Sequence, residues 1–141
     1  MQHDTTPPTR SLNVLAAERY ISLTTFTRNG TPKSTPVWPI DAGHGRIGFV
    51  TSSKTWKIKR ITGDSHVLVQ PSDAKGRVRE GTHAVAGTAQ IEVGDTFHAI
   101  HRKVLKKYGY QLRLINLLHA LPGRATGHRN DCAVIVSFDA S

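Results

Sequence analysis

Short runs of β-branched and apolar residues, separated by turn residues, dominate the first two thirds of the chain. Such runs are typical of strands in antiparallel sheets. They predict strands at residues 20–28, 33–40, 46–50, 66–70 and 78–93, and the apolar run at 132–138 predicts a last one. Asn29-Gly30 is a strong signal for a tight hairpin between the first two strands, and residues 41–45 are predicted to form a turn.

In the last third of the chain the apolar residues recur at helical spacing instead. They are Phe97, Ile100, Val104, Leu105, Tyr108, Leu112, Ile115, Leu118 and Leu121. A break at Gly109 predicts a pair of helices, which Pro122-Gly123 ends. Shorter helices are predicted after Ser11 and over residues 54–61. Hairpins with little room for parallel crossovers predict a mainly β fold, a split antiparallel β-barrel with peripheral helices.

The two ends of the chain and its single cysteine bear on organisation and location. Residues 1–10 are predicted to be a disordered tail, because two prolines and polar residues offer nothing to bury. Residues 11–141 have the length of one ordinary domain. Cys132 alone allows no internal disulfide, which favours a reducing compartment. With no signal-peptide pattern and no bilayer-spanning apolar run, we expect a cytoplasmic protein.

The charge balance is unusual for a globular domain. A formal net charge of +9 and a pI near 10.2 favour an anionic partner, which could be nucleic acid, a membrane surface or a polyanionic small molecule. Aromatic residues make up only 6% of the chain, and no strand interleaves basic with aromatic residues as single-strand binders do. We therefore expect a small-molecule partner rather than nucleic acid.

The most informative stretch is residues 51–61, which follows the predicted strand at 46–50. Three hydroxyl residues stand where a helix N-cap is expected, and a short basic helix follows them. Hydroxyls and free backbone N–H groups beside several cations suit an anionic group such as a phosphate. The alternative is an ordinary solvated basic face. The candidate residues are Thr51, Ser52, Ser53, Lys54, Lys57 and Arg60.

The predicted strand at residues 33–40 carries two prolines, Pro36 and Pro39. Proline cannot donate a ladder hydrogen bond, so this strand is expected to be interrupted, bulged or at an edge. Backbone groups left out of the ladder can contact a ligand instead. Trp38 could stack on such a ligand or pack in the core, and the sequence favours neither.

Several of these segments together resemble a known family. They are Ser34-Thr35-Pro36-Val37-Trp38, then Phe49-Val50-Thr51-Ser52-Ser53 with Lys57, Arg60-Ile61, Asp64 and Val67 after it. In this order they resemble the split β-barrel flavin and deazaflavin oxidoreductases, the relatives of pyridoxamine 5′-phosphate oxidase. Gly87-Thr88-Ala89-Gln90-Ile91 is similar to a later strand of that family, so the resemblance covers roughly residues 12–95.

The resemblance implies a homodimer with two cofactor sites at the subunit interface. A cofactor phosphate would lie on Thr51, Ser52, Ser53 and Lys57, with Arg60 or Lys54 nearby. The segment Ser34, Thr35, Pro36, Val37 and Trp38 would run along the ring. Members that use FMN typically carry an arginine on that strand and a Thr-Asn pair at the phosphate turn. This chain has neither, which points to the branch that uses the deazaflavin coenzyme F-420.

The charge surplus agrees with this branch, because the deazaflavin carries an oligoglutamate tail as well as a phosphodiester. Lys33, Lys59, Lys75, Arg77 and Arg79 would suit that acidic tail. The function expected is an F-420-dependent oxidoreductase that transfers a hydride to or from a conjugated small-molecule acceptor. The alternatives are an FMN-dependent oxidase or reductase and a non-catalytic cofactor- or tetrapyrrole-binding protein.

The sequence does not single out a proton donor or a metal site. Tyr20, Tyr108, Tyr110 or a histidine could protonate a reduced substrate, and nothing selects among them. His98 and His101 are three residues apart on a predicted helix, but no third metal ligand is placed. We therefore expect no metal.

Overall fold

A computed structural model describes residues 15–119 and 130–138 of the chain, with side chains described up to residue 109 and from residue 130. The predicted tail, the helix start at Ser11 and the Pro122-Gly123 helix end lie outside these residues. Seven strands form one sheet in which every pairing is antiparallel. The strands are β1 Tyr20–Phe26, β2 Pro32–Val37, β3 Ile40–Gly43, β4 Arg46–Thr51, β5 His66–Ser72, β6 Val85–Glu92 and β7 Cys132–Ser137.

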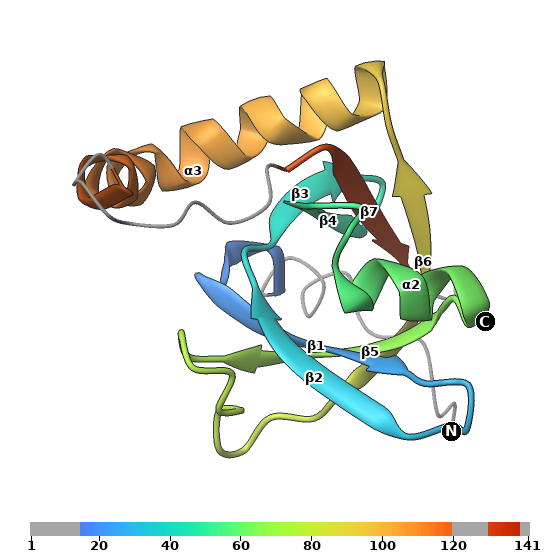
Figure 1. The fold of residues 1–141 in the computed structure, drawn as a ribbon. Helices are drawn as coiled ribbons and strands as arrows, with labels where there is room; N and C mark the ends of the chain where they lie inside the picture. The colour runs from blue at the N-terminus through green and yellow to red at the C-terminus, as the bar shows by residue number, and fades with distance from the viewer. Residues whose placement is uncertain (1–14, 120–129, 139–141) are drawn as a thin grey trace.

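The strand order explains why the sheet curls into a half-barrel. The order is β2-β1-β5-β6-β7-β4-β3, so β2 and β3 lie at opposite edges. They are nevertheless consecutive in the chain and separated only by Trp38 and Pro39. The sheet must therefore bend until its two edges come together at this dipeptide, as Figure 1 shows. This confirms the predicted split antiparallel barrel.

The proline-containing strand is interrupted, as expected, but the strand after it was not predicted. Residues 33–40 were expected to form one strand and residues 41–45 a turn. The structure instead ends β2 at Val37 and begins a separate strand, β3, at Ile40. Pro39 has no N–H to continue the ladder, so the chain leaves β1 there and pairs with β4. The Asn29-Gly30 hairpin is confirmed, with Gly30 at a φ of 82°.

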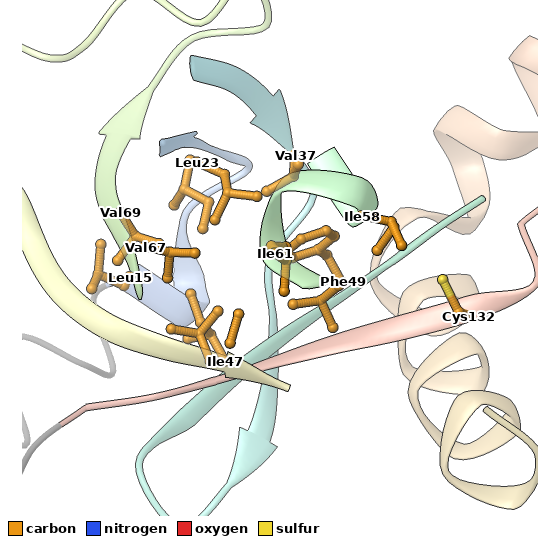
Figure 2. Packing of buried hydrophobic residues seen from close by; sticks show 14 residues of the cluster. Leu15, Leu23, Val37, Ile47, Phe49, Ile58, Ile61, Val67, Val69 and Cys132 are labelled. Atoms are coloured by element: carbon orange, nitrogen blue, oxygen red, sulfur yellow. The ribbon is translucent and has the colours of Figure 1, made fainter. Parts of the chain in front are cut away.

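The helices α2 (Trp56–Gly63) and α3 (Asp95–His119) accompany the sheet. Ile58 and Ile61 of α2 are buried in the core that fills the half-barrel, and Figure 2 shows both beside Phe49. The predicted break at Gly109 is wrong, because α3 continues through that residue. A single glycine costs a helix only about 1 kcal/mol, which the packing of the neighbouring turns can offset.

The long helix α3 covers the sheet on the side of β3, β4 and β7. Its apolar positions Phe97, Ile100, Val104 and Tyr108 are buried with Ile40 from β3 in a second core cluster. These residues follow the helical spacing seen in the sequence. No helix in the described part of the chain is long and apolar enough to cross a membrane.

Candidate functional site

A cavity of about 230 Å³ lies where β2 ends, beside the end of β4, α2, α3 and the segment before β7. It brings together five residues of the predicted cofactor site from three separate segments. These five are Pro36, Val37, Trp38, Thr51 and Lys57, and the other lining residues are Val50, His101, Val104 and Asn130. The closure of the half-barrel places these segments side by side.

Trp38 is held in place by aromatic contacts on one side while it lines the cavity. Its ring stacks on Tyr108 of α3, with 4.6 Å between centroids and 13° between planes. The Tyr20 ring meets it edge-on at 6.5 Å. Trp38 therefore packs against the second core, as one interpretation of the sequence had it, and it also forms a cavity wall. Its stacking on a ligand stays a prediction.

Two adjacent residues of α3 fix the dipeptide between β2 and β3. The Tyr108 hydroxyl donates to the Pro39 carbonyl at 2.8 Å, and the Lys107 ammonium donates to the same oxygen at 2.6 Å. Lys107 Nζ also donates to the carbonyls of Ala16 at 2.6 Å and Glu18 at 2.7 Å. Pro39 cannot donate to a ladder, but its carbonyl is the point where α3 holds the chain.

The environment sets the protonation of both residues. Burial raises the pKa of Tyr108 above its ordinary value, so the phenol keeps its proton. Burial, with the Arg19 guanidinium nearby, lowers the pKa of Lys107 to about 8. The three carbonyl oxygens stabilise its charged form, and we expect an ammonium at neutral pH. Tyr108 is therefore a positioning residue and no longer a candidate proton donor.

Lys57 is the cationic group of the cavity. Its side chain is half-buried, and its pKa is lowered first by this burial and then by the Arg60 guanidinium. Among the described residues no carboxylate forms an ion pair with it. A partly desolvated cation without a carboxylate favours binding of an external anion, because the anion restores the stabilisation that water no longer provides.

The three hydroxyl residues do not cap the helix, and this expectation was wrong. The N-cap of α2 is Thr55, which makes no side-chain capping bond. Thr51 is the last residue of β4, and it is buried, as is Ser52. The Ser52 hydroxyl accepts from the Lys54 backbone N–H at 3.2 Å. The Ser52 hydroxyl therefore stabilises the turn between β4 and α2 rather than the first turn of the helix.

Ser53 already donates to an acidic side chain. Its backbone N–H and its hydroxyl each donate to a carboxylate oxygen of Asp131, at 2.7 Å in both cases. These bonds lower the pKa of Asp131, so the carboxylate is ionised at neutral pH. An external anion could use the Ser53 donors only if Asp131 moved away. Sequence reasoning missed this contact, because the two residues are 78 positions apart.

The other expected residues lie outside this cavity. Arg60 lines a second cavity, on a neighbouring face of α2. Lys54 and Ser34 are exposed, and the Ser34 hydroxyl hydrogen-bonds the Thr24 hydroxyl at 2.7 Å. Thr35 is half-buried in β2 and does not line the cavity. The structure therefore places five of the expected residues at this cavity and Arg60 at the second, and the remaining ones line neither of the two.

Two of the surplus cations expected to face an acidic tail are already paired. Arg77 binds Asp73, with Nε at 2.7 Å from Oδ2, and Arg79 binds Glu18, with Nη1 at 2.9 Å from Oε2. Lys59 lies over the Trp56 ring at 4.5 Å. Lys33 and Lys75 are exposed.

His101 is the lining residue whose role the sequence did not indicate. Its ring stacks on Phe97, with 5.4 Å between centroids and 10° between planes. The sequence allowed a histidine as proton donor without selecting one, and the pairing with His98 suggested a metal. No group of three metal-ligating side chains occurs among residues 15–109 and 130–138. Placing His101 beside Lys57 required knowing which sheet face α3 covers, which helical spacing alone does not give.

Comparison with known proteins identifies the fold. No family model matches the chain, and no curated protein matches it by sequence. A conserved hypothetical protein from Mycobacterium tuberculosis is 19% identical, with a TM-score of 0.58 over 99% of this chain and 84% of that one. A Listeria innocua protein provisionally assigned as a pyridoxamine 5′-phosphate oxidase is 12% identical, with a TM-score of 0.54 over 91% and 90%. The chain has the split-barrel fold.

A third structure widens the range of ligands known on this fold. HutZ, the haem storage protein of Vibrio cholerae, is 9% identical to this chain, with a TM-score of 0.58 over 95% of this chain and 91% of that one. At these identities the likeness establishes the fold and does not establish a ligand.

Proposed function

We propose that the protein is an oxidoreductase that binds the deazaflavin coenzyme F-420 at the cavity around Lys57. The observation that carries this proposal is the meeting of Pro36, Val37, Trp38, Thr51 and Lys57 around one cavity. These residues come from the segments whose resemblance implied the ring and phosphate contacts. When bound, the coenzyme would supply the hydride, and the chain would bind it, orient it and exclude water.

The residues present fit the chemistry of such a group. Lys57 offers the phosphate a half-buried cation that no carboxylate of the described residues neutralises. Pro36, Val37 and the indole of Trp38 offer an apolar wall for a planar ring. Because the Ser53 N–H and hydroxyl already donate to Asp131, Lys57 is the principal group that can contact a phosphate in this arrangement.

The cavity of one chain is too small for the complete coenzyme. Its volume of about 230 Å³ is below the range of about 300–1,000 Å³ that is usual for small-molecule sites. We therefore propose that a second copy of the chain completes the site, as a homodimer. A homodimer would explain why the cavity of one chain is lined by the expected residues and yet encloses only part of the coenzyme.

His101 is the proposed proton-carrying group. Lys57 and His101 are the titratable side chains that line the cavity. An imidazole nitrogen can hold and release a proton, so His101 can deliver a proton to an acceptor that has received a hydride. The stack of His101 on Phe97 fixes the plane of the ring. A conjugated small molecule is the acceptor that this pairing of hydride and proton suits.

A titration with F-420, followed by fluorescence, tests the binding proposal. Lys57→Ala should weaken binding by about tenfold to a hundredfold, since a charge-assisted hydrogen bond contributes roughly 1.5–3 kcal/mol. Lys54→Ala is the matched control, because Lys54 is exposed and lies outside the cavity. Equal affinity of the wild type and Lys57→Ala would contradict the phosphate assignment.

The second candidate function is non-catalytic tetrapyrrole binding, which His101 specifically favours. Histidine is a common axial ligand of haem iron, and this one lies in the wall of an apolar cavity. The fold also occurs in a haem storage protein. A haem titration with wild type and His101→Ala separates the candidates: a Soret shift that needs His101 supports tetrapyrrole binding, and its absence favours the deazaflavin.

A further inference from the structure

A second and larger cavity, of about 550 Å³, lies between the β1–β2 hairpin and α2. Its volume falls within the usual range for small-molecule sites. The α2 residues that line it, Trp56, Lys59, Arg60 and Gly63, follow the i, i+3, i+4, i+7 spacing of one helix face. The hairpin contributes Phe26, Thr27, Arg28 and Gly30, and Asp64 completes the lining.

Arg60 is fixed in this cavity by a buried partner. Its Nε donates to the Thr25 hydroxyl at 2.7 Å, and Thr25 is only 1% exposed. The same hydroxyl lies 3.5 Å from the Lys33 carbonyl, to which it can donate its own proton. The Thr25 hydroxyl accepts a hydrogen bond from Nε only, and it carries no charge to neutralise the guanidinium. The two Nη groups of Arg60 can therefore bind an anionic ligand in a bidentate manner.

The cavity carries an excess of positive charge. Arg28, Lys59 and Arg60 all line it, and among the described residues none of the three forms an ion pair. Asp64 is the one carboxylate of the lining, and it accepts from the backbone N–H and the ring of His66, at 3.0 and 2.9 Å. Three cations against one occupied carboxylate suit a group with more than one negative charge.

An aromatic surface adjoins these cations. Trp56 is 70% exposed, although it is one of the largest apolar side chains. Lys59 Nζ lies over its ring at 4.5 Å from the centroid, and Phe26 also lines the cavity. An exposed indole beside a guanidinium fork is a surface on which a planar aromatic group can stack while an attached phosphate meets the arginines.

We propose that this second cavity binds a phosphate-bearing aromatic small molecule of the nucleoside monophosphate class. The phosphate lies against Arg60 and Arg28, and the base stacks on Trp56. This site goes beyond the proposed function, because it shares no lining residue with the Lys57 cavity. It also explains why Arg60, which sequence reasoning assigned to the first site, is held on β1 instead.

A calorimetric titration of the full chain with AMP, without any other cofactor, tests the proposal. Wild type should bind saturably, and Arg60→Ala and Arg28→Ala should each weaken binding by about tenfold or more. Arg28→Ala covers the case in which Arg60→Ala fails to fold, since no bond in the described part of the chain depends on Arg28. Trp56→Leu should lose the affinity that stacking of the base contributes, and it should bind AMP no better than ribose 5-phosphate.

Two controls make the outcome specific to this cavity. Lys75→Ala removes an exposed cation elsewhere, and Lys57→Ala removes the cation of the first cavity; both should bind AMP as wild type does. No binding of AMP would overturn the proposal. Equal binding of AMP and inorganic phosphate would overturn the aromatic part of the ligand class, and loss of AMP binding in Lys57→Ala would overturn the location.

Discussion

The indole of Trp38 lies flat on the phenol ring of Tyr108, 4.6 Å from centroid to centroid. This contact joins the dipeptide between the two edge strands of the half-barrel to the helix that covers the sheet. Trp38 lines the cavity, whereas Tyr108 is 1% exposed and holds the Pro39 carbonyl. The shape of the cavity wall is therefore set by a residue that does not line it.

Two substitutions of Tyr108 should distinguish the contribution of its hydroxyl to stability from the contribution of its ring. Tyr108→Phe loses one buried hydrogen bond and should reduce the free energy of unfolding by about 1 kcal/mol. Tyr108→Ala also removes the stacking surface and should reduce it by about 3–5 kcal/mol. Urea denaturation measures both, with Leu105→Ala, half-exposed on the same helix, as the control with a small effect. A Phe variant as unstable as the Ala variant would contradict this division.

Lys107 should matter more for stability than its neighbour on α3. Lys107→Met removes a donor from the Ala16, Glu18 and Pro39 carbonyls, of which the Pro39 carbonyl keeps the Tyr108 hydroxyl. It should reduce the free energy of unfolding by about 2 kcal/mol. Lys106→Met is the matched control, because Lys106 is exposed and should change stability by less than about 0.5 kcal/mol. Equal effects of the two substitutions in urea denaturation would show that the carbonyl contacts contribute nothing.

Asp131 should contribute stability that acid removes. Its pKa is lowered by the two hydrogen bonds from Ser53, so the unfolded chain binds the proton more readily than the folded chain. Stability from this carboxylate is present above its ordinary pKa of 3.8 and is lost as the pH falls through the lowered value. Thermal unfolding between pH 2 and pH 6 should show a shallower acid slope for Asp131→Asn than for wild type. Parallel slopes would contradict the Ser53 contact.

Cys132 should be inert in the folded protein. Burial, followed by the nearby Asp131 charge, raises the pKa of its thiol to about 11. The thiol is fully buried and donates to the Thr51 carbonyl at 3.4 Å. Iodoacetamide at pH 8 should therefore modify Cys132 only as fast as the chain unfolds. Rapid alkylation under native conditions would contradict this placement.

The raised pKa of the Cys132 thiol should also make the stability of the protein depend on pH above about pH 9. Between the ordinary thiol pKa of 9.0 and the folded value of about 11, the unfolded chain loses the proton first. The contribution of Cys132 to stability should accordingly fall across this range. The difference between the unfolding free energies of wild type and Cys132→Ala, measured from pH 8 to pH 11, isolates this effect from that of Lys107, which acts in the opposite direction.

Local sequence signals predicted most strands and the first hairpin because these depend on neighbouring residues, but the strand predicted at 78–93 begins only at Val85. Asn29-Gly30 specified a turn, and Phe97, Ile100 and Val104 specified the buried face of α3. The strand β3 was missed because Ile40 resembles the end of the previous run. Only the pairing with β4, which depends on the whole sheet, shows that a new strand begins there.

Part of the residue set that lines the candidate cavity was predictable, but its geometry was predictable only in part. Lys57 and Trp38 were named from motif order, and the structure brings them to one cavity. Arg60 and Lys57 are also close in sequence, yet a bond to Thr25 on β1 takes Arg60 to the other cavity. The Ser53–Asp131 contact and the position of His101 depend on residues far apart in the chain, which no local pattern indicates.

The proposed deazaflavin site is tested most sharply by a side-by-side fluorescence titration of the purified wild-type chain with F-420 and with FMN. We predict saturable binding of F-420 at one equivalent per chain, and weaker binding of FMN, which lacks the acidic tail. Tighter binding of FMN, or no binding of F-420, would contradict the proposal that the cavity around Lys57 is a deazaflavin site.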